Sequence, residues 1–199
     1  MKELTEKYIT DHIKTSIELK QKILSEGALP KQIKQAAELC IEALRNGNKL
    51  MFAGNGGSAG DAQHLAAELV GRYRFNRPGL PAIALTTDTS MLTAIANDHS
   101  YADVFARQVQ AQGKAGDVFI GISTSGNSEN VLKAFVQAKA IRAKSIGFAG
   151  SGGAIQQSCD ICLSVPSTNT AFIQESHIMI GQIICGFIEE TLFQQYKPE

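Results

Sequence analysis

The stretch KLMFAGNGGSAGDAQHLAAE, residues 49–68, decides how this chain folds. Its first five residues form an apolar run typical of a buried strand, and a helical pattern begins near Asp61. Glycines dominate the connection, residues 54–60, where they allow positive φ and a close approach of the backbone to a ligand. A helix that starts just beyond presents free N–H groups and the positive end of its dipole. The stretch therefore predicts a strand, an anion cradle and a helix.

The glycine loop matches neither of the two commonest phosphate-binding motifs. No Lys-Ser/Thr pair follows it, as a P-loop requires, and the pattern G-x-G-x-x-G is not matched. Many strand-to-helix turns are rich in glycine without binding anything. A tight turn with no ligand is therefore the alternative interpretation of residues 54–60.

A second loop of the same kind favours the phosphate interpretation. Residues 117–122 form another short apolar run, and the hydroxyl-rich sequence STSGNS, residues 123–128, follows it. A helical run over residues 131–140 comes next, so the loop offers several neutral donors to a phosphate near a helix start. A well-capped helix would explain one serine, but it does not explain the cluster.

Bulk composition limits the classes of function. The chain has 199 residues, of which 44% are hydrophobic, and no linker-like stretch divides it, so we expect one domain. Its 19 basic and 19 acidic residues balance, which argues against binding to nucleic acid or to a membrane surface through basic patches. No secretory segment is recognised and no apolar run approaches the roughly 20 residues that span a bilayer. We therefore expect a cytoplasmic protein.

The cysteines predict reduced thiols. Cys40 and Cys185 lie in apolar contexts, and Cys159 and Cys162 spell C-x-x-C at the start of a predicted strand. Because no second pair accompanies this motif, a metal or redox role is the less favoured interpretation.

The order of periodic segments predicts an α/β fold. Two helices precede the sheet, strands then alternate with helices, and a long helix closes the chain. The expected helices cover residues 3–25, 30–46, 61–73, 90–97, 101–112, 128–141, a short segment ending at 158, and 170–196; the expected strands cover 49–53, 82–85, 117–122, 145–149 and 161–165. The result is a five-stranded parallel sheet flanked by helices, with ligands at the carboxyl ends of the strands.

The first helix carries an apolar stripe that a five-stranded sheet does not need. Ile9, Ile13 and Ile17 share one helical face. We expect this helix to pack against another subunit, because a long exposed stripe would be costly. The alternative is that it covers one face of the sheet in its own chain. We divide the single domain, residues 1–199, into N-terminal helices used in oligomerisation, 1–47, and a sheet with the catalytic region, 48–199.

Two helices carry candidate site residues. His64 and Glu68 are four residues apart, so they share a helical face immediately after the glycine loop. Such a pair is often a plain surface contact, but its place beside a phosphate loop favours a site in which Glu68 is a general base. On the last helix, Gln174 and Gln182 lie about 80° apart and can share a site, whereas His177 lies about 60° from Gln174 in the opposite sense.

The segment after the helix of His64 and Glu68 carries arginines. Arg72, Arg74 and Arg77 could reach a phosphate across a subunit interface, or they could belong to an ordinary solvated loop. Their spacing does not separate the two interpretations.

Six motifs together resemble the phosphoheptose isomerases, a family of sugar-isomerase (SIS) domain enzymes. They span nearly the whole chain and lie at residues 54–58, 61–64, 72–79, 97–98, 121–128 and 173–177. The resemblance implies a single SIS domain that converts sedoheptulose 7-phosphate to D-glycero-D-manno-heptose 7-phosphate, toward the heptose of the lipopolysaccharide core. It also implies a cytoplasmic homotetramer and an enediol mechanism in which a base moves a proton between neighbouring carbons.

The resemblance assigns roles by position. Glu68 matches the family's base, and His64 is the second candidate catalytic residue. The sugar-phosphate contacts would be Asn55, Gly56, Gly57, Asn97, Asp98, Ser123, Thr124, Ser125, Ser128 and Gln174. The zinc ligands would be His64, Glu68, Gln174 and Gln182. The family has His where this chain has Gln182, and an amide has no titratable group and ligates weakly. The implied zinc site is therefore in question.

A non-catalytic SIS relative is the alternative. A tetramer that binds the replication initiator DnaA has the same fold and also lacks the second His on the last helix. The sequences of residues 80–85, 92–98 and 190–193 resemble this relative. In that relative the position of Glu68 is not acidic, so keeping Glu68 favours the isomerase.

Overall fold

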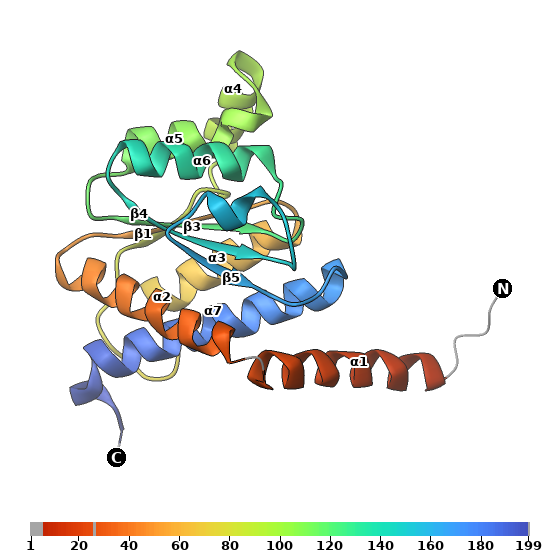
Figure 1. Cartoon of the computed structure of the whole chain (residues 1–199). Helices are drawn as coiled ribbons and strands as arrows, with labels where there is room; N and C mark the ends of the chain where they lie inside the picture. Colours follow the sequence, from red (N-terminus) through yellow and green to blue (C-terminus); the bar gives the residue numbers. More distant parts are fainter. Residues whose placement is uncertain (1–5, 26, 199) are drawn as a thin grey trace.

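The fold alternates helices with strands after two N-terminal helices (Figure 1). The computed structural model describes residues 6–25 and 27–198. Its main elements are α1 (Glu6–Ser25), α2 (Ala28–Arg45), β1 (Leu50–Gly54), α3 (Gly57–Val70), β2 (Ala82–Ala84), α4 (Thr89–Asp98), α5 (Val104–Gln112), β3 (Val118–Ser123), α6 (Glu129–Ala140), β4 (Lys144–Ala149), β5 (Ile161–Ser164) and α7 (Thr170–Leu192). Single 3₁₀ turns cover Tyr101–Asp103, Ala154–Gln157 and Gln194–Tyr196. The predicted start of the first helix at residue 3 lies outside the described residues.

The described strands form one parallel sheet of five, in the order β2-β1-β3-β4-β5. This confirms the predicted α/β class. Alternate residues face opposite sides, so Leu50 and Phe52 enter the core under α2, α3 and α7, while Met51 enters the core under α5 and α6. Figure 1 shows these two groups of helices covering the two faces. Both faces are buried, which explains why the strands read as continuous apolar runs.

The strand order reverses between β1 and β3, and this point brings the two predicted loops together. β1 and β3 are neighbours in register, with Gly54 opposite Ile122. The chain leaves β1 toward β2 on one side and continues from β3 toward β4 on the other. In open parallel sheets, ligands bind at the carboxyl ends of the strands at such a switch point. The glycine loop and the hydroxyl loop therefore share one edge of the sheet.

Helix α3 begins earlier than the sequence predicted. The expected start was near Asp61, whereas the helix starts at Gly57. A tight turn forces this, because Ser58 N donates to Asn55 O and a Cβ on Gly54 would lie 2.6 Å from Ser58 O. Close packing of this turn outweighs the poor helix propensity of Gly57 and Gly60. The free loop is therefore shorter than residues 54–60.

Helix α7 is part of the protein core, although it is long and apolar enough to cross a membrane. By length and composition it could cross a membrane, with a mean hydropathy of 1.3, which differs from the expectation that no segment approaches such a length. However, 56% of this apolar window is buried inside the protein, against the sheet and α2 and α3. This burial is the pattern of a helix that completes a core.

Helix α1 extends away from the sheet (Figure 1). Ser16 and Lys20 bind the carboxylate of Glu175 on α7, and Leu19 and Ile23 are buried. The predicted stripe stays in solvent, because Ile9, Ile13 and Ile17 are 59%, 54% and 50% exposed. The alternative that this helix covers the sheet of its own chain is therefore wrong. Packing against another subunit, and the division of the domain at residues 47 and 48, stay predictions.

Candidate active site

Serine hydroxyls cluster where β3 ends and α6 begins. Ser123 Oγ lies 2.8 Å from Ser128 Oγ and 3.4 Å from Ser125 Oγ. Ser128 N also donates to Ser123 Oγ, which draws the loop over the first turn of α6. Thr124 is half-buried in the same loop. Hydroxyls gathered at a helix N-terminus provide donors and a positive dipole end, which is an arrangement that binds phosphate.

Two asparagines tie this loop to the glycine loop. Asn55 and Asn130 exchange reciprocal amide hydrogen bonds of 2.9 Å, and Asn130 is buried. The Tyr101 hydroxyl donates to Asn55 Oδ1 at 3.2 Å from the exposed side. Sequence reasoning missed Asn130 and Tyr101. For Asn130 the available signal in the sequence was an amide side chain just after the hydroxyl cluster. The pair fixes the distance between the two predicted ligand loops.

The glycine loop makes room for an amide from α7. Gly56 has a φ of +54°, which favours glycine. A Cβ on Gly57 would lie 2.5 Å from Gln174 Nε2, so this amide packs directly on the start of α3. The contact places Gln174 beside the predicted phosphate loop.

An imidazole and a carboxylate meet two turns further along α3. His64 Nε2 lies 2.9 Å from Glu68 Oε1, and Gln182 Nε2 lies 3.5 Å from the same imidazole nitrogen. The side chain of His64 is 48% exposed and that of Glu68 is 20% exposed. Gln174 thus meets the start of α3 and Gln182 meets its middle, so the two helices run side by side in the same direction. Solvent reaches the imidazole, while the carboxylate is partly shielded.

Asp61, one turn before His64, is an additional titratable group. Burial raises its pKa to about 6, although the nearby His64 works against this rise. Its Oδ2 atom is buried and has no hydrogen-bond partner among the described residues. Sequence reasoning used Asp61 only as a helix start and did not predict this perturbed carboxyl.

Asn97 and Asp98 lie apart from the other predicted substrate contacts. They hydrogen bond to each other at 2.8 Å and are exposed at the end of α4. Figure 1 shows α4 projecting beyond α5 and α6. Within the described part of the chain, neither side chain bonds to the serine loop or to His64. Their contact with a substrate stays a prediction.

His177 points away from Gln182, as its angle on α7 predicted, and is an interior residue. It is 1% exposed, packs edge-on against Phe148 and lies 3.0 Å from Ala149 O through Nε2. Burial lowers its pKa to about 4. A neutral imidazole held in the core cannot replace the missing imidazole at Gln182.

Arg77 contradicts both interpretations of the arginine loop. Its side chain has no exposed surface and forms an ion pair with the equally buried Glu189 on α7, with Nε and Oε1 3.1 Å apart. It therefore belongs neither to a solvated loop nor to a phosphate site. Arg72 and Arg74 are exposed.

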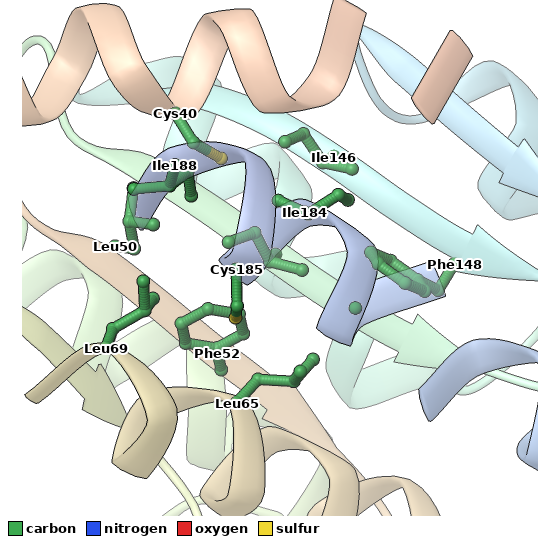
Figure 2. Close-up of a pocket in the computed structure, with 12 residues that line it drawn as sticks. Cys40, Leu50, Phe52, Leu65, Leu69, Ile146, Phe148, Ile184, Cys185 and Ile188 are labelled. Carbon is green, nitrogen blue, oxygen red and sulfur yellow. The ribbon is translucent and has the colours of Figure 1, made fainter. Parts of the chain in front are cut away.

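The apolar cavity in Figure 2 is not the ligand site. Its volume is about 10 Å³, which is room for about one water molecule, and its lining is wholly apolar apart from two thiols. Cys40 and Cys185 face it from α2 and α7, and burial raises the pKa of Cys185 to about 12. Both are free thiols, as predicted. This cavity is a packing void between the sheet and the helices.

The C-x-x-C pair lies elsewhere, at the edge strand β5. Cys159 and Cys162 are free and half-buried. A hydrogen bond from the Cys159 thiol lowers the pKa of Cys162 to about 7. Among the described residues, no group of three His, Cys, Asp or Glu side chains gathers to hold a metal. The predicted reduced state agrees with this arrangement.

The donors at α3 and α7 suit a weak zinc site. His64 and Glu68 supply the imidazole nitrogen and carboxylate oxygen that zinc prefers. Gln182 adds an amide, whose oxygen and nitrogen can exchange places by rotation of the side chain. With two strong donors and neutral amides, the chain's own residues fit zinc less tightly than a set with two imidazoles.

Known proteins match this chain over almost its whole length. The SIS domain family model matches residues 12–150. Phosphoheptose isomerase 2 of Campylobacter jejuni is 58% identical over 187 residues, which are 94% of this chain and 93% of that protein. The phosphoheptose isomerase of Aneurinibacillus thermoaerophilus is 54% identical and covers 94% of this chain and 95% of its own. A solved phosphoheptose isomerase from Neisseria gonorrhoeae has a TM-score of 0.87 at 44% identity, covering 93% of this chain and 98% of that one.

These relatives bear out the resemblance that the motifs carried. They are all named as isomerases, and they give no support to the DnaA-binding alternative. Each of these matches covers more than nine-tenths of the chain. The chain belongs to the SIS domain family and, within it, to the phosphoheptose isomerases.

Proposed function

We propose that this isomerase converts sedoheptulose 7-phosphate to D-glycero-D-manno-heptose 7-phosphate. The observation that carries the proposal is the position of the carboxylate Glu68. It lies on the helix that starts from one predicted phosphate loop, and the amide pair of Asn55 and Asn130 ties that loop to the second. The relatives' name supplies the phosphoheptose. The product would serve the synthesis of lipopolysaccharide core heptose in the cytoplasm.

The reaction moves protons and leaves the overall oxidation state unchanged. Glu68 would take the proton from C1, beside the C2 ketone, and the electrons of that C–H bond would form an enediol. A proton taken up by the ketone oxygen O2 completes this enediol. Return of a proton to C2 and loss of the O1 proton then leave an aldehyde at C1 and a hydroxyl at C2, so two protons are lost and two are gained. His64, 2.9 Å from Glu68, would orient the carboxylate and share its proton. The serines and the N-terminus of α6 would hold the phosphate and keep the sugar in place.

We also propose that zinc binds at His64 and Glu68, with Gln174 and Gln182 as weak neutral ligands. When bound, zinc would polarise oxygens of the sugar as a Lewis acid. Support comes from the contact of Gln182 with His64 and from the shared path of α3 and α7.

A homotetramer is the proposed assembly. The exposed stripe Ile9, Ile13 and Ile17 on α1 supports association, because an isolated helix face of this kind is costly in water. Sedimentation of the protein and of a triple Ile→Ser variant of this stripe tests it: a tetramer that dissociates in the variant is the expected result, and a monomeric wild type would overturn it.

The first experiment follows the reaction directly. Purified protein is incubated with sedoheptulose 7-phosphate, and the aldose signal at C1 is followed by NMR with added zinc, with a chelator and with neither. Product in any of the three supports the isomerase, and the difference between zinc and chelator measures the metal's contribution. No product in all three would overturn the proposed function.

A further inference from the structure

The buried ion pair of Arg77 and Glu189 joins the two helices that carry the candidate site residues. Arg77 lies in the segment after α3, and Glu189 lies near the end of α7. Neither side chain has exposed surface. Two charges removed from water are tolerated only when hydrogen bonds satisfy both of them. The hydrogen bonds that these two side chains make therefore show which segments the pair holds together.

Arg77 caps the carboxyl end of α3. Its Nη2 donates to Glu68 O at 2.8 Å and its Nη1 donates to Leu69 O at 2.6 Å. The last carbonyls of a helix have no partner within the helix, and a cation there is favoured by the helix dipole. The guanidinium therefore holds the final turn of α3, and that turn contains Glu68 itself.

Glu189 extends this restraint to α7. Its two carboxylate oxygens accept from Tyr73 N at 3.0 Å and from Arg74 N at 2.7 Å, besides binding Arg77. Glu189 comes seven residues after Gln182, which is about two helical turns, so both face α3 from one side of α7. The ion pair thus fixes how far α3 can slide or turn against α7.

Packing at the middle of the two helices shows how little freedom remains. A Cβ on Gly181 would lie 2.5 Å from Leu65 Cδ1, so α7 rests directly on α3 beside His64 and Gln182. The ion pair holds the carboxyl ends of α3 and α7 together, and the contact of Gln174 with Gly57 holds their amino ends together. The carboxylate of Glu68 lies between these two fixed points.

We propose that Arg77 and Glu189 are positioning residues for the isomerase, holding the carboxylate of Glu68 in line with His64 and Gln182. The inference rests on the proposed function, in which Glu68 is the base. Both residues are fully buried and act through Glu68 without touching the sugar. Because displacement of a reacting group by about 1 Å can cost about a hundredfold in rate, loss of the pair should lower kcat more than it lowers substrate binding.

The chain offers a matched control just before β3. Asp117 is also a fully buried carboxylate that accepts from two backbone N–H groups, of Lys49 and Lys114, and pairs with one cation, Lys49 Nζ at 2.6 Å. It resembles Glu189 in chemistry, and its printed partners, Lys49 and Lys114, belong neither to α3 nor to α7. Asp117→Asn therefore reproduces the loss of a buried ion pair without reaching Glu68.

The test compares Glu189→Gln with Asp117→Asn. For each, kcat and KM are measured per folded active site, with folding monitored by thermal unfolding. We expect a fall in kcat of about tenfold or more in Glu189→Gln with KM changed less than about twofold, and a change in kcat below about twofold in Asp117→Asn. An equal fall in both variants, or no fall in Glu189→Gln, would overturn the proposal. If Glu189→Gln does not fold, Arg77→Lys keeps the charge, loses the forked contact with the carbonyls of Glu68 and Leu69, and is judged by the same criteria.

A second readout needs no substrate and separates this inference from the proposed function. The ring signals of His64, assigned by their absence in His64→Gln, report the position of its neighbour Glu68 in the NMR spectrum. We expect them to shift in Glu189→Gln and to stay in place in Asp117→Asn. A wild type without turnover would remove the proposed function, while unmoved His64 signals in Glu189→Gln would remove the positioning role.

Discussion

His64 and His177 occupy two regions that use the same side chain in opposite ways. His64 lies on the face of α3, 48% exposed and 2.9 Å from a carboxylate. His177 lies in the core, 1% exposed, against a phenyl ring and a backbone carbonyl. The first is open to solvent, whereas burial keeps the second neutral.

The difference shows that neighbours and solvent decide what an imidazole does. The sequence places His177 in QESH, three residues from a predicted ligand, and this closeness along the chain suggests a functional residue. The helix turns it toward Ala149, away from α3. Its Nδ1 atom is buried without a hydrogen-bond partner in the described structure. A site residue needs access to ligand, and His177 has none.

The largest effect on kcat should come from a change beside His64 on α3. Glu68→Gln removes the proposed base but keeps its size, so we expect kcat to fall about 10²–10⁴-fold with an unchanged melting temperature. Turnover of sedoheptulose 7-phosphate by NMR and thermal unfolding measure the two quantities. Glu190→Gln, at a half-buried α7 carboxylate paired with Lys197, is the matched control and should keep wild-type kcat. Wild-type turnover in Glu68→Gln would exclude Glu68 as the base.

A change at His177 in the core should lower stability and leave kcat nearly unchanged. His177→Gln leaves buried polar atoms poorly partnered, so we expect the free energy of unfolding to fall by about 1–3 kcal/mol. Because the side chain does not reach the site, kcat per folded enzyme should stay within about twofold. Urea unfolding and kinetics on the same preparation give both numbers. A selective loss of kcat with full stability would break the comparison between the two histidines.

Adding a second imidazole to the surface region should sharpen the contrast. In Gln182→His an imidazole nitrogen replaces an amide 3.5 Å from His64 Nε2. We expect zinc affinity to rise at least about tenfold, or about 1.4 kcal/mol. Competition with a fluorescent chelator measures it, and the same substitution in a His64→Gln background is the control, because it restores only one imidazole. Equal zinc affinity in Gln182→His and wild type would place the metal elsewhere.

The smallest effect concerns the pH dependence of stability. The pKa of His177 is lowered from 6.5 to about 4, so its contribution is complete above pH 6.5 and is lost as pH falls toward 4. The pKa of Asp61 is raised from 3.8 to about 6, so its penalty is complete above pH 6 and disappears as pH falls toward 3.8. The two slopes oppose each other between about pH 4 and 6.

Asp61→Asn separates these slopes. It should raise the melting temperature by a few degrees at pH 7.5 and leave it unchanged near pH 3.5, where Asp61 is protonated in both states. Thermal unfolding across this range is the measurement. Glu190→Gln again serves as the control. A gain that is equal at both pH values would show that burial of the charge is not its cause.

Much of the arrangement of the candidate site could be predicted from local sequence, and the features that could not be predicted share one cause. The strand ends placed residues 54–57 and 123–128 at one edge of a parallel sheet, and helical spacing paired His64 with Glu68. The start of α3 at Gly57, the amide pair of Asn130 and the burial of Arg77 did not follow. Each depends on contacts with a segment far away in the chain, which periodicity and composition do not encode.

The sequence by itself determined the α/β order, the two ligand loops and the family, because short-range patterns of apolar residues, glycines and hydroxyls carry that information. The tertiary structure alone decided which polar residues face the site and which are locked in the core. Parallel packing of α3 on α7 brings Gln182 to His64 and sets Arg77 on Glu189. The physical reason is that a side chain's charge and proton affinity depend on burial and on partners that only folding brings together.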